Sequence, residues 1–126
     1  MVLGVGVDII EIERVAEEIQ RHGERFLKRV YAPEEVAYCE EKSYRAQHYA
    51  VRFAAKEATF KALGTGWQDG LSWQDVVLRN DAYGKPALAL SGRARELAEQ
   101  KGVARAHVSV SHCRTYAAAV VVLESE

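Results

Sequence analysis

Residues 51–66 read VRFAAKEATFKALGTG and form the most strongly helical stretch of the sequence. Because each residue of a helix advances by about 100°, Phe53 and Phe60 lie about 20° apart, and we expect the face that they share to be buried. The alanines around them would let the helix pack closely against its neighbours. The longest helix is therefore predicted over residues 46–63, and the Gly64-Thr65-Gly66 segment is expected to end it.

The same helix face carries an acid, because Glu57 falls within about 60° of both phenylalanines. Lys61 follows four residues later, so one interpretation is an exposed ion pair between Glu57 and Lys61. The aromatic rings favour another, since a carboxylate among apolar groups needs a partner or a cation if it is to stay charged. A magnesium ion, Mg²⁺, would satisfy it, because this ion prefers oxygen ligands.

A second acid, Asp8, ends the apolar run Val2–Val7, which we predict to be a buried strand. The following segment places Ile12, Val15 and Ile19 at helical spacing before Gly23, which is expected to end the helix. Asp8 is then either the N-cap of that helix or a metal ligand at the end of a strand, and the local sequence favours neither interpretation over the other. Asp8 and Glu57 together would supply the one or two carboxylates that Mg²⁺ takes from a protein.

The remaining pattern predicts an α+β domain, with helices packed on a mainly antiparallel sheet. Short helices are expected at 24–30 and 33–41, and another from Ser91 to about Lys101. A hairpin is expected from strands 75–79 and 86–90, and a second from strands 107–111 and 116–123. The last strand reads YAAAVVVL and is apolar on both faces. We therefore expect part of its surface to meet another subunit.

Three arginines, Arg14, Arg21 and Arg25, would line one edge of the first helix if Gly23 does not break it. They are either ordinary solvated charges or a docking surface for an acidic partner, since guanidinium groups bind carboxylates in pairs of hydrogen bonds. His107 and His112 have no metal ligand at suitable spacing, so a structural role is expected for both.

The bulk composition excludes several classes of protein. A chain of 126 residues is predicted to form one domain over residues 1–126. Its net charge of -1 does not indicate nucleic-acid binding. No apolar run reaches the roughly 20 residues that a membrane helix needs, and Asp8 interrupts any signal-like start, so a cytoplasmic protein with no membrane partner is expected. The two cysteines, Cys39 and Cys113, are expected to be free thiols.

Four segments together resemble one family. They are Gly4–Asp8 followed by Arg14, then Arg52–Ala58 continuing through Lys61–Gly66, then Asn80 with Gly84-Lys85-Pro86, and finally His107–His112. In this order they are similar to the short, single-domain bacterial 4′-phosphopantetheinyl transferases, the holo-acyl-carrier-protein synthases. The resemblance covers nearly the whole chain. One departure is Ala32, where the family usually has a threonine that caps the following helix.

The resemblance implies the 4′-phosphopantetheinyl transferase fold and the transfer of 4′-phosphopantetheine from coenzyme A to a serine of apo-acyl carrier protein. The reaction releases adenosine 3′,5′-bisphosphate and supports fatty acid biosynthesis. The resemblance also implies a homotrimer with active sites between subunits. The implied ligands of the Mg²⁺ cofactor are Asp8 and Glu57, and the implied catalytic residues are Glu57 and Lys61. The residues implied to bind coenzyme A are Lys61, Gly64, Gly66, Lys85, Pro86 and His107. Those implied to dock the carrier are Arg14, Arg21 and Arg25.

Two other functions stay open on the residues alone. A hydrolase could use the same metal and phosphate site on a nucleotide. An oligomeric adaptor could use the arginines to bind acidic partners, although it would have no need of Glu57 between two phenylalanines.

Overall fold

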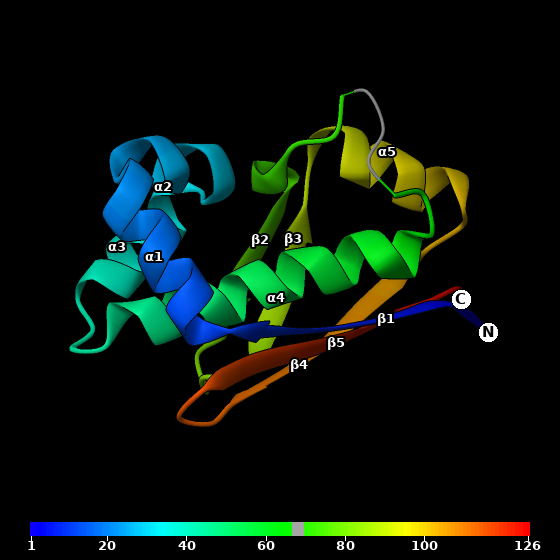
Figure 1. The fold of residues 1–126 in the computed structure, drawn as a ribbon. Helices are drawn as coiled ribbons and strands as arrows, with labels where there is room; N and C mark the ends of the chain where they lie inside the picture. Colours follow the sequence, from blue (N-terminus) through cyan, green and yellow to red (C-terminus); the bar gives the residue numbers. More distant parts are fainter. Residues whose placement is uncertain (67–69) are drawn as a thin grey trace.

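A long central helix lying across an antiparallel sheet organises the computed structural model, which describes residues 1–66 and 70–126 (Figure 1). In chain order the elements are β1 (Val2–Glu11), α1 (Ile12–His22), α2 (Glu24–Val30), α3 (Pro33–Glu40), α4 (Arg45–Leu63), the 3-10 helix η1 (Trp73–Asp75), β2 (Val76–Asn80), β3 (Pro86–Leu90), α5 (Gly92–Gln100), β4 (Arg105–His112) and β5 (Tyr116–Glu124). This arrangement confirms the predicted α+β class.

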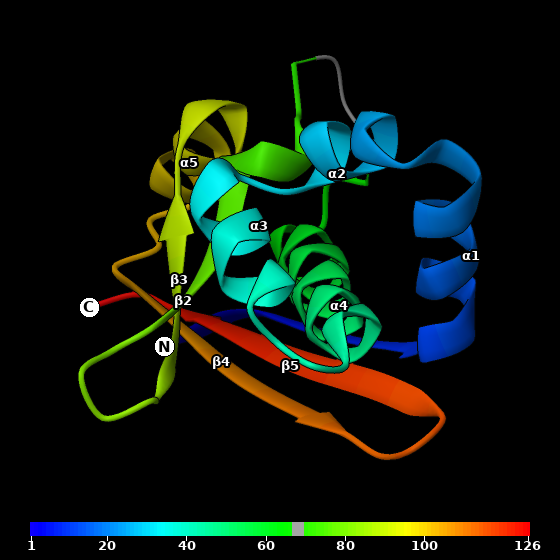
Figure 2. The ribbon, with the colours of Figure 1, turned by 90° about the vertical axis from the view of Figure 1, so that its left-hand side faces the viewer.

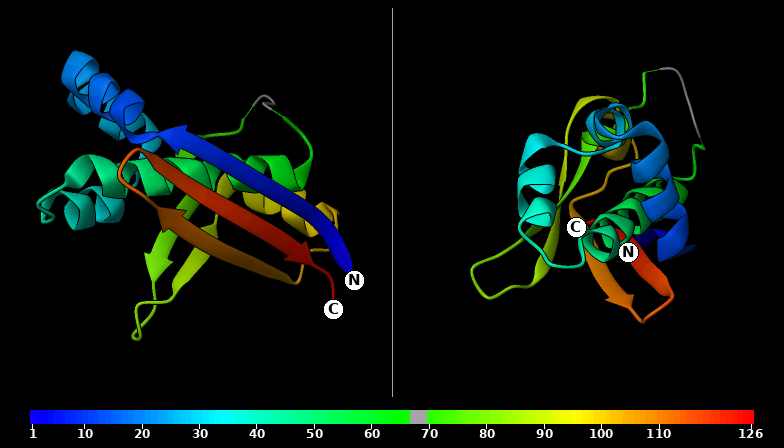
Figure 3. Two further views of the ribbon diagram at one scale, coloured as in Figure 1. Left: turned by 60° about the horizontal axis from the view of Figure 1, so that its bottom comes forward. Right: turned by 60° about the vertical axis from the view of Figure 1, so that its left-hand side comes forward.

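Within the described ranges, one sheet has the strand order β1-β5-β4 and the other is the β2-β3 hairpin, and all pairings are antiparallel. Helix α4 covers one face of the β1-β5-β4 sheet, and in the part of the chain that the structure describes no element covers the other face (Figure 3, left). Seen along its axis, α4 has the sheet below it, α1 on one side, and the β2-β3 hairpin with α5 on the other (Figure 2). The helix is therefore the common neighbour of most of the other elements.

Two glycines let β1 lie directly on the backbone of α4. A Cβ atom on Gly4 would stand 2.0 Å from the carbonyl oxygen of Ala62, and one on Gly6 would stand 1.9 Å from that of Ala58. Such distances are far inside van der Waals contact, so a side chain at either glycine would force the strand away from the helix. The first motif of the sequence thus needs its glycines for close packing.

The prediction for β1 was wrong in two respects. The strand continues to Glu11, so Asp8 lies within it, and α1 begins at Ile12. Asp8 is therefore not a helix N-cap. The strand is also not buried on both faces: Val5, Val7 and Ile9 are 60%, 62% and 65% exposed, because none of the described elements covers the face of β1 that points away from α4.

The other helices follow their apolar patterns. Ile12, Val15 and Ile19 are buried as predicted, and Gly23 ends α1 with a φ of 53°. Helix α4 begins one residue earlier than predicted and ends at Leu63. Among the described residues, no helix is both long and apolar enough to cross a membrane.

Candidate active site

A cavity of about 610 Å³ opens between β1, the first two helices, α4 and η1. Its lining includes Asp8 from β1, Glu57 and Phe53 from α4, Trp73 from η1 and Arg14 from α1. Two acids that stand far apart in the sequence are thus brought to one site, which the sequence alone could not show.

The Asp8 side chain points from within β1 toward α4, and Asp8 is not the last residue of the strand. Its side chain is only 14% exposed, and its Oδ1 accepts a hydrogen bond of 3.0 Å from the Nζ of Lys61. The same Nζ donates to the Val7 carbonyl oxygen, also at 3.0 Å. Lys61 therefore forms its ion pair across the contact between helix and strand, and not with Glu57 one turn earlier on its own helix.

Glu57 is half-buried beside this pair. Burial raises the pKa of its carboxyl group, the negative charge of Asp8 raises it further, and the positive charge of Lys61 opposes both. Two carboxylates in one partly desolvated cavity favour a cation between them. A cation held between the two carboxylates would explain why Glu57 stands among aromatic rings, and the charge of Asp8 explains why Lys61 lies beside it.

The two carboxylates fit a hard divalent cation that takes its other ligands from water and from substrate. No group of three or more His, Cys, Asp or Glu side chains suited to a metal occurs in the part of the chain that the structure describes. Two carboxylates suit Mg²⁺, which usually keeps waters and binds substrate phosphates. They do not suit Zn²⁺, which in proteins is usually held by three or four nitrogen or sulfur ligands.

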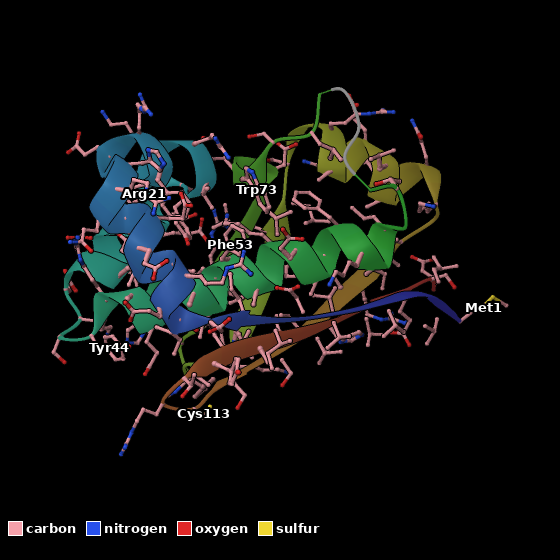
Figure 4. All side chains as sticks on the ribbon, viewed as in Figure 1. Met1, Arg21, Tyr44, Phe53, Trp73 and Cys113 are labelled. Atoms are coloured by element: carbon pink, nitrogen blue, oxygen red, sulfur yellow. The ribbon has the colours of Figure 1, made fainter. Side chains whose placement is uncertain are left out.

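The three arginines do not share one helix edge, because Gly23 separates α1 from α2. Arg14 lines the large cavity. Arg21 lies exposed near the end of α1 (Figure 4). Arg25 is on α2, where its Nη2 is 3.5 Å from the Nδ1 of His22. All three are exposed, two on α1 and one on α2, so they do not form the predicted straight stripe.

The other residues predicted to contact coenzyme A are spread over the chain. Gly64, with a φ of 72°, ends α4, and Gly66 follows with a φ of 59°. Lys85 precedes β3 and Pro86 begins it. His107 lies on the outward face of β4, where its Nε2 is 3.1 Å from Oε1 of Glu124. None of these positions lines the cavity of Asp8 and Glu57.

Sequence analysis missed a buried ion pair next to the catalytic candidates. The Nζ of Lys56 donates to Oε1 of Glu35 at 2.7 Å, and both side chains are 0% exposed. It also donates to the carbonyl oxygens of Trp73, at 3.1 Å, and Val76. Burial lowers the pKa of Lys56, and the Glu35 carboxylate opposes this effect. The sequence did hold a signal, because Lys56 stands between Phe53 and Phe60 at helical spacing.

Glu35 also replaces part of the missing cap of α3. Its Oε1 accepts from the Ala32 backbone N–H at 3.0 Å, and its Oε2 accepts from that of Leu78 at 3.2 Å. Ala32 itself makes no side-chain cap. The departure at Ala32 is thus partly compensated from within the helix.

Comparison with known proteins decides the family. A model of the 4′-phosphopantetheinyl transferase superfamily matches residues 4–121. The chain belongs to this superfamily. A 4′-phosphopantetheinyl transferase relative, the holo-[acyl-carrier-protein] synthase of Koribacter versatilis, is 47% identical over 124 residues, covering 98% of this chain and 99% of that one.

Solved structures of 4′-phosphopantetheinyl transferases share the whole fold. The holo-[acyl-carrier-protein] synthase of Neisseria meningitidis has a TM-score of 0.90 and 32% identity, over 99% of this chain and 100% of that one. The Helicobacter pylori holo-[acyl-carrier-protein] synthase, solved in complex with coenzyme A, has a TM-score of 0.83 and 32% identity, over 95% of this chain and 99% of that one.

Proposed function

We propose that this chain is a holo-acyl-carrier-protein synthase, which transfers 4′-phosphopantetheine from coenzyme A to a serine of apo-acyl carrier protein and releases adenosine 3′,5′-bisphosphate. The observation that carries the proposal is the convergence of Asp8 and Glu57 at one cavity, with Lys61 paired to Asp8 beside it. Relatives that match the chain over nearly its full length bear the same name, and one was solved with coenzyme A. The adaptor interpretation gives this cavity no task.

The residues at the cavity can divide the work of a displacement at phosphorus. Asp8 and Glu57 would hold Mg²⁺, and when bound this ion neutralises charge on the diphosphate of the substrate. Lys61 is exposed and carries a positive charge beside Asp8, where it can contact a phosphate oxygen or protonate the leaving group. Glu57 has two candidate tasks, holding the ion and taking the proton of the serine hydroxyl, and we assign it metal binding as its first role.

Arg14, Arg21 and Arg25 would dock an acidic surface of the carrier. They are exposed on α1 and α2, and Arg14 reaches the cavity itself. A carrier held there would have its serine directed into the cavity, and such orientation can lower a barrier by several kcal/mol.

We further propose that the protein is a homotrimer. Val5 and Val7 of β1 pair with Val122 and Val120 of β5, so the open face of the sheet carries a contiguous apolar surface. Large exposed apolar surfaces usually meet another protein. A second copy of this chain would also allow Lys85, Pro86 and His107 of one subunit to approach the cavity of another. Val7→Glu should yield monomers in size-exclusion chromatography with light scattering, and a wild-type protein that is monomeric would contradict the assignment.

The proposal includes a single domain over residues 1–126, a place in the cytoplasm and a role in fatty acid biosynthesis. Cys39 and Cys113 are both free thiols, as proteins of a reducing compartment usually have.

The direct test is mass spectrometry of apo-acyl carrier protein after incubation with the enzyme, Mg²⁺ and coenzyme A. The carrier should gain one 4′-phosphopantetheine group, and Asp8→Ala and Glu57→Ala should remove nearly all of this gain while remaining folded. A hydrolase would instead release adenosine 3′,5′-bisphosphate from coenzyme A without any carrier. That outcome, or an unmodified carrier, would overturn the proposal.

A further inference from the structure

Two aromatic rings form one wall of the cavity that holds Asp8 and Glu57. The rings of Phe53 and Trp73 are stacked, with centroids 4.9 Å apart and planes inclined by 27° (Figure 4). Neither side chain is fully buried, although Phe53 belongs to the helix at the centre of the fold. The cavity therefore has an apolar side directly beside its charged side.

The wall is held in place from behind. The rings of Trp73 and Phe60 meet edge to face at a centroid distance of 5.6 Å, and Phe60 is only 5% exposed. The backbone oxygen of Trp73 accepts a hydrogen bond from the buried ammonium group of Lys56. The Trp73 ring is held by the ring of Phe60 and by the hydrogen bond to its main chain, so it loses little conformational freedom when a ligand binds. It can therefore act as a prearranged contact surface.

The proposed reaction supplies an occupant of matching chemistry. The arm of coenzyme A is uncharged: a methylene group joins it to the phosphate, and a carbon with two methyl groups, a carbon with a hydroxyl group and two amides follow. It is joined directly to the phosphate that is transferred, so it must leave the charged side of the cavity within a few bonds. An apolar wall next to the carboxylates meets that requirement, and methyl and amide groups pack well on aromatic faces.

We propose that Phe53 and Trp73 bind the pantetheine arm of coenzyme A and so determine recognition of the transferred group. This inference rests on the proposed function, because it takes coenzyme A as the substrate. The adenosine 3′,5′-bisphosphate half of the molecule makes no use of the wall. The two parts of the substrate are thus read by different surfaces.

The test compares two probes that differ by the arm, coenzyme A and adenosine 3′,5′-bisphosphate, by calorimetry with Mg²⁺ present. Trp73→Ala should weaken coenzyme A binding roughly tenfold, which corresponds to the loss of one aromatic contact. Binding of the bisphosphate should change by less than about twofold. Trp73→Phe, which keeps a ring, should restore most of the affinity.

Phe53→Leu is the second variant, because it removes a ring from the same wall and leaves the backbone contact of Trp73 untouched. In a Trp67→Phe background, where Trp73 is the only tryptophan of the sequence, coenzyme A should also change the fluorescence and the bisphosphate should not. Equal losses for both probes, or no loss for coenzyme A, would overturn the inference. So would a raised KM for the carrier with unchanged coenzyme A affinity, which would assign the wall to the carrier protein. In each of these cases wild-type binding and transfer would still support the proposed function, whose failure would appear as no binding of either probe.

Discussion

Removing the buried ammonium group of Lys56 should destabilise the protein severely. Lys56→Met keeps most of the volume of the side chain but leaves the Glu35 carboxylate without its cation in a site that is 0% exposed. Breaking a buried ion pair from one side costs about 3–5 kcal/mol. The lost hydrogen bonds to Trp73 and Val76 belong to the same network, so their cost is included in this figure and not added.

A loss of this size is a large part of the roughly 5–15 kcal/mol that holds a domain together. At about 4 °C per kcal/mol for a chain of this length, Tm should fall by about 12–20 °C. Urea unfolding followed by circular dichroism at pH 7 measures the change directly. Glu35→Gln combined with Lys56→Met removes both charges and keeps an acceptor for one of the two N–H groups, that of Ala32 or that of Leu78, so it should recover part of the loss.

Lys28→Met is the matched control for this experiment. The Lys28 side chain is 80% exposed, and its Nζ lies 3.6 Å from Glu24, so its removal should cost less than about 0.5 kcal/mol. If Lys56→Met were as mild as Lys28→Met, the pair would contribute nothing to stability. If the double variant were no better than Lys56→Met, the loss would come from packing and not from a stranded charge.

Three further perturbations follow from single contacts. Gly6→Ala should cost at least about 3 kcal/mol, because its Cβ would meet the Ala58 carbonyl oxygen at 1.9 Å. Gly102→Ala meets no neighbouring atom, and only the positive φ of 81° disfavours the new side chain, so it should cost about 1–2 kcal/mol. Similar losses for Gly6→Ala and Gly102→Ala would contradict the close contact between Gly6 and Ala58. The Arg105 hydrogen bond, followed by that of His107, lowers the pKa of Glu124 from 4.5 to about 2. Glu124 therefore stabilises the fold above pH 4.5, and this contribution is lost as the pH falls through about 2. Between these two pH values the urea midpoint of the wild type should fall with pH more steeply than that of Glu124→Gln, which lacks the titrating carboxyl group. Reversing Arg14 and Arg21 to Glu should raise KM for the carrier and flatten its salt dependence in steady-state assays, whereas an unchanged salt profile would remove α1 from the docking surface.

Local periodicity was enough to predict most elements. Helix α4 and the two hairpins begin and end within about two residues of the predicted bounds, because their patterns are set by burial on one face. The start of α1 was misplaced, because Ile9 and Ile10 fit a helical pattern equally well. In the fold they pair with Ala118 and Ala117 of β5, a contact that no local pattern contains.

The candidate site was predicted residue by residue but not as a geometry. Glu57 was identified because an acid stood where an apolar residue was expected. Its neighbour Lys56 was not identified, although it is more deeply buried, because its partner Glu35 lies 21 residues away. Pairs of this kind depend on how helices cross, which periodicity does not determine.

The position of Asp8 follows from a match between two repeats. Two residues of a strand advance by about 6.6 Å and four residues of a helix by about 6.0 Å. Gly4 lies on Ala62 and Gly6 on Ala58, so β1 moves back along α4 by one such step. The next inward residue is Asp8, and the same step brings it to the turn of α4 that precedes Glu57. The two glycines thus set both the distance and the register of the acids, so a strand displaced at Gly6 should separate the two carboxylates that we propose to hold Mg²⁺, even where the protein still folds.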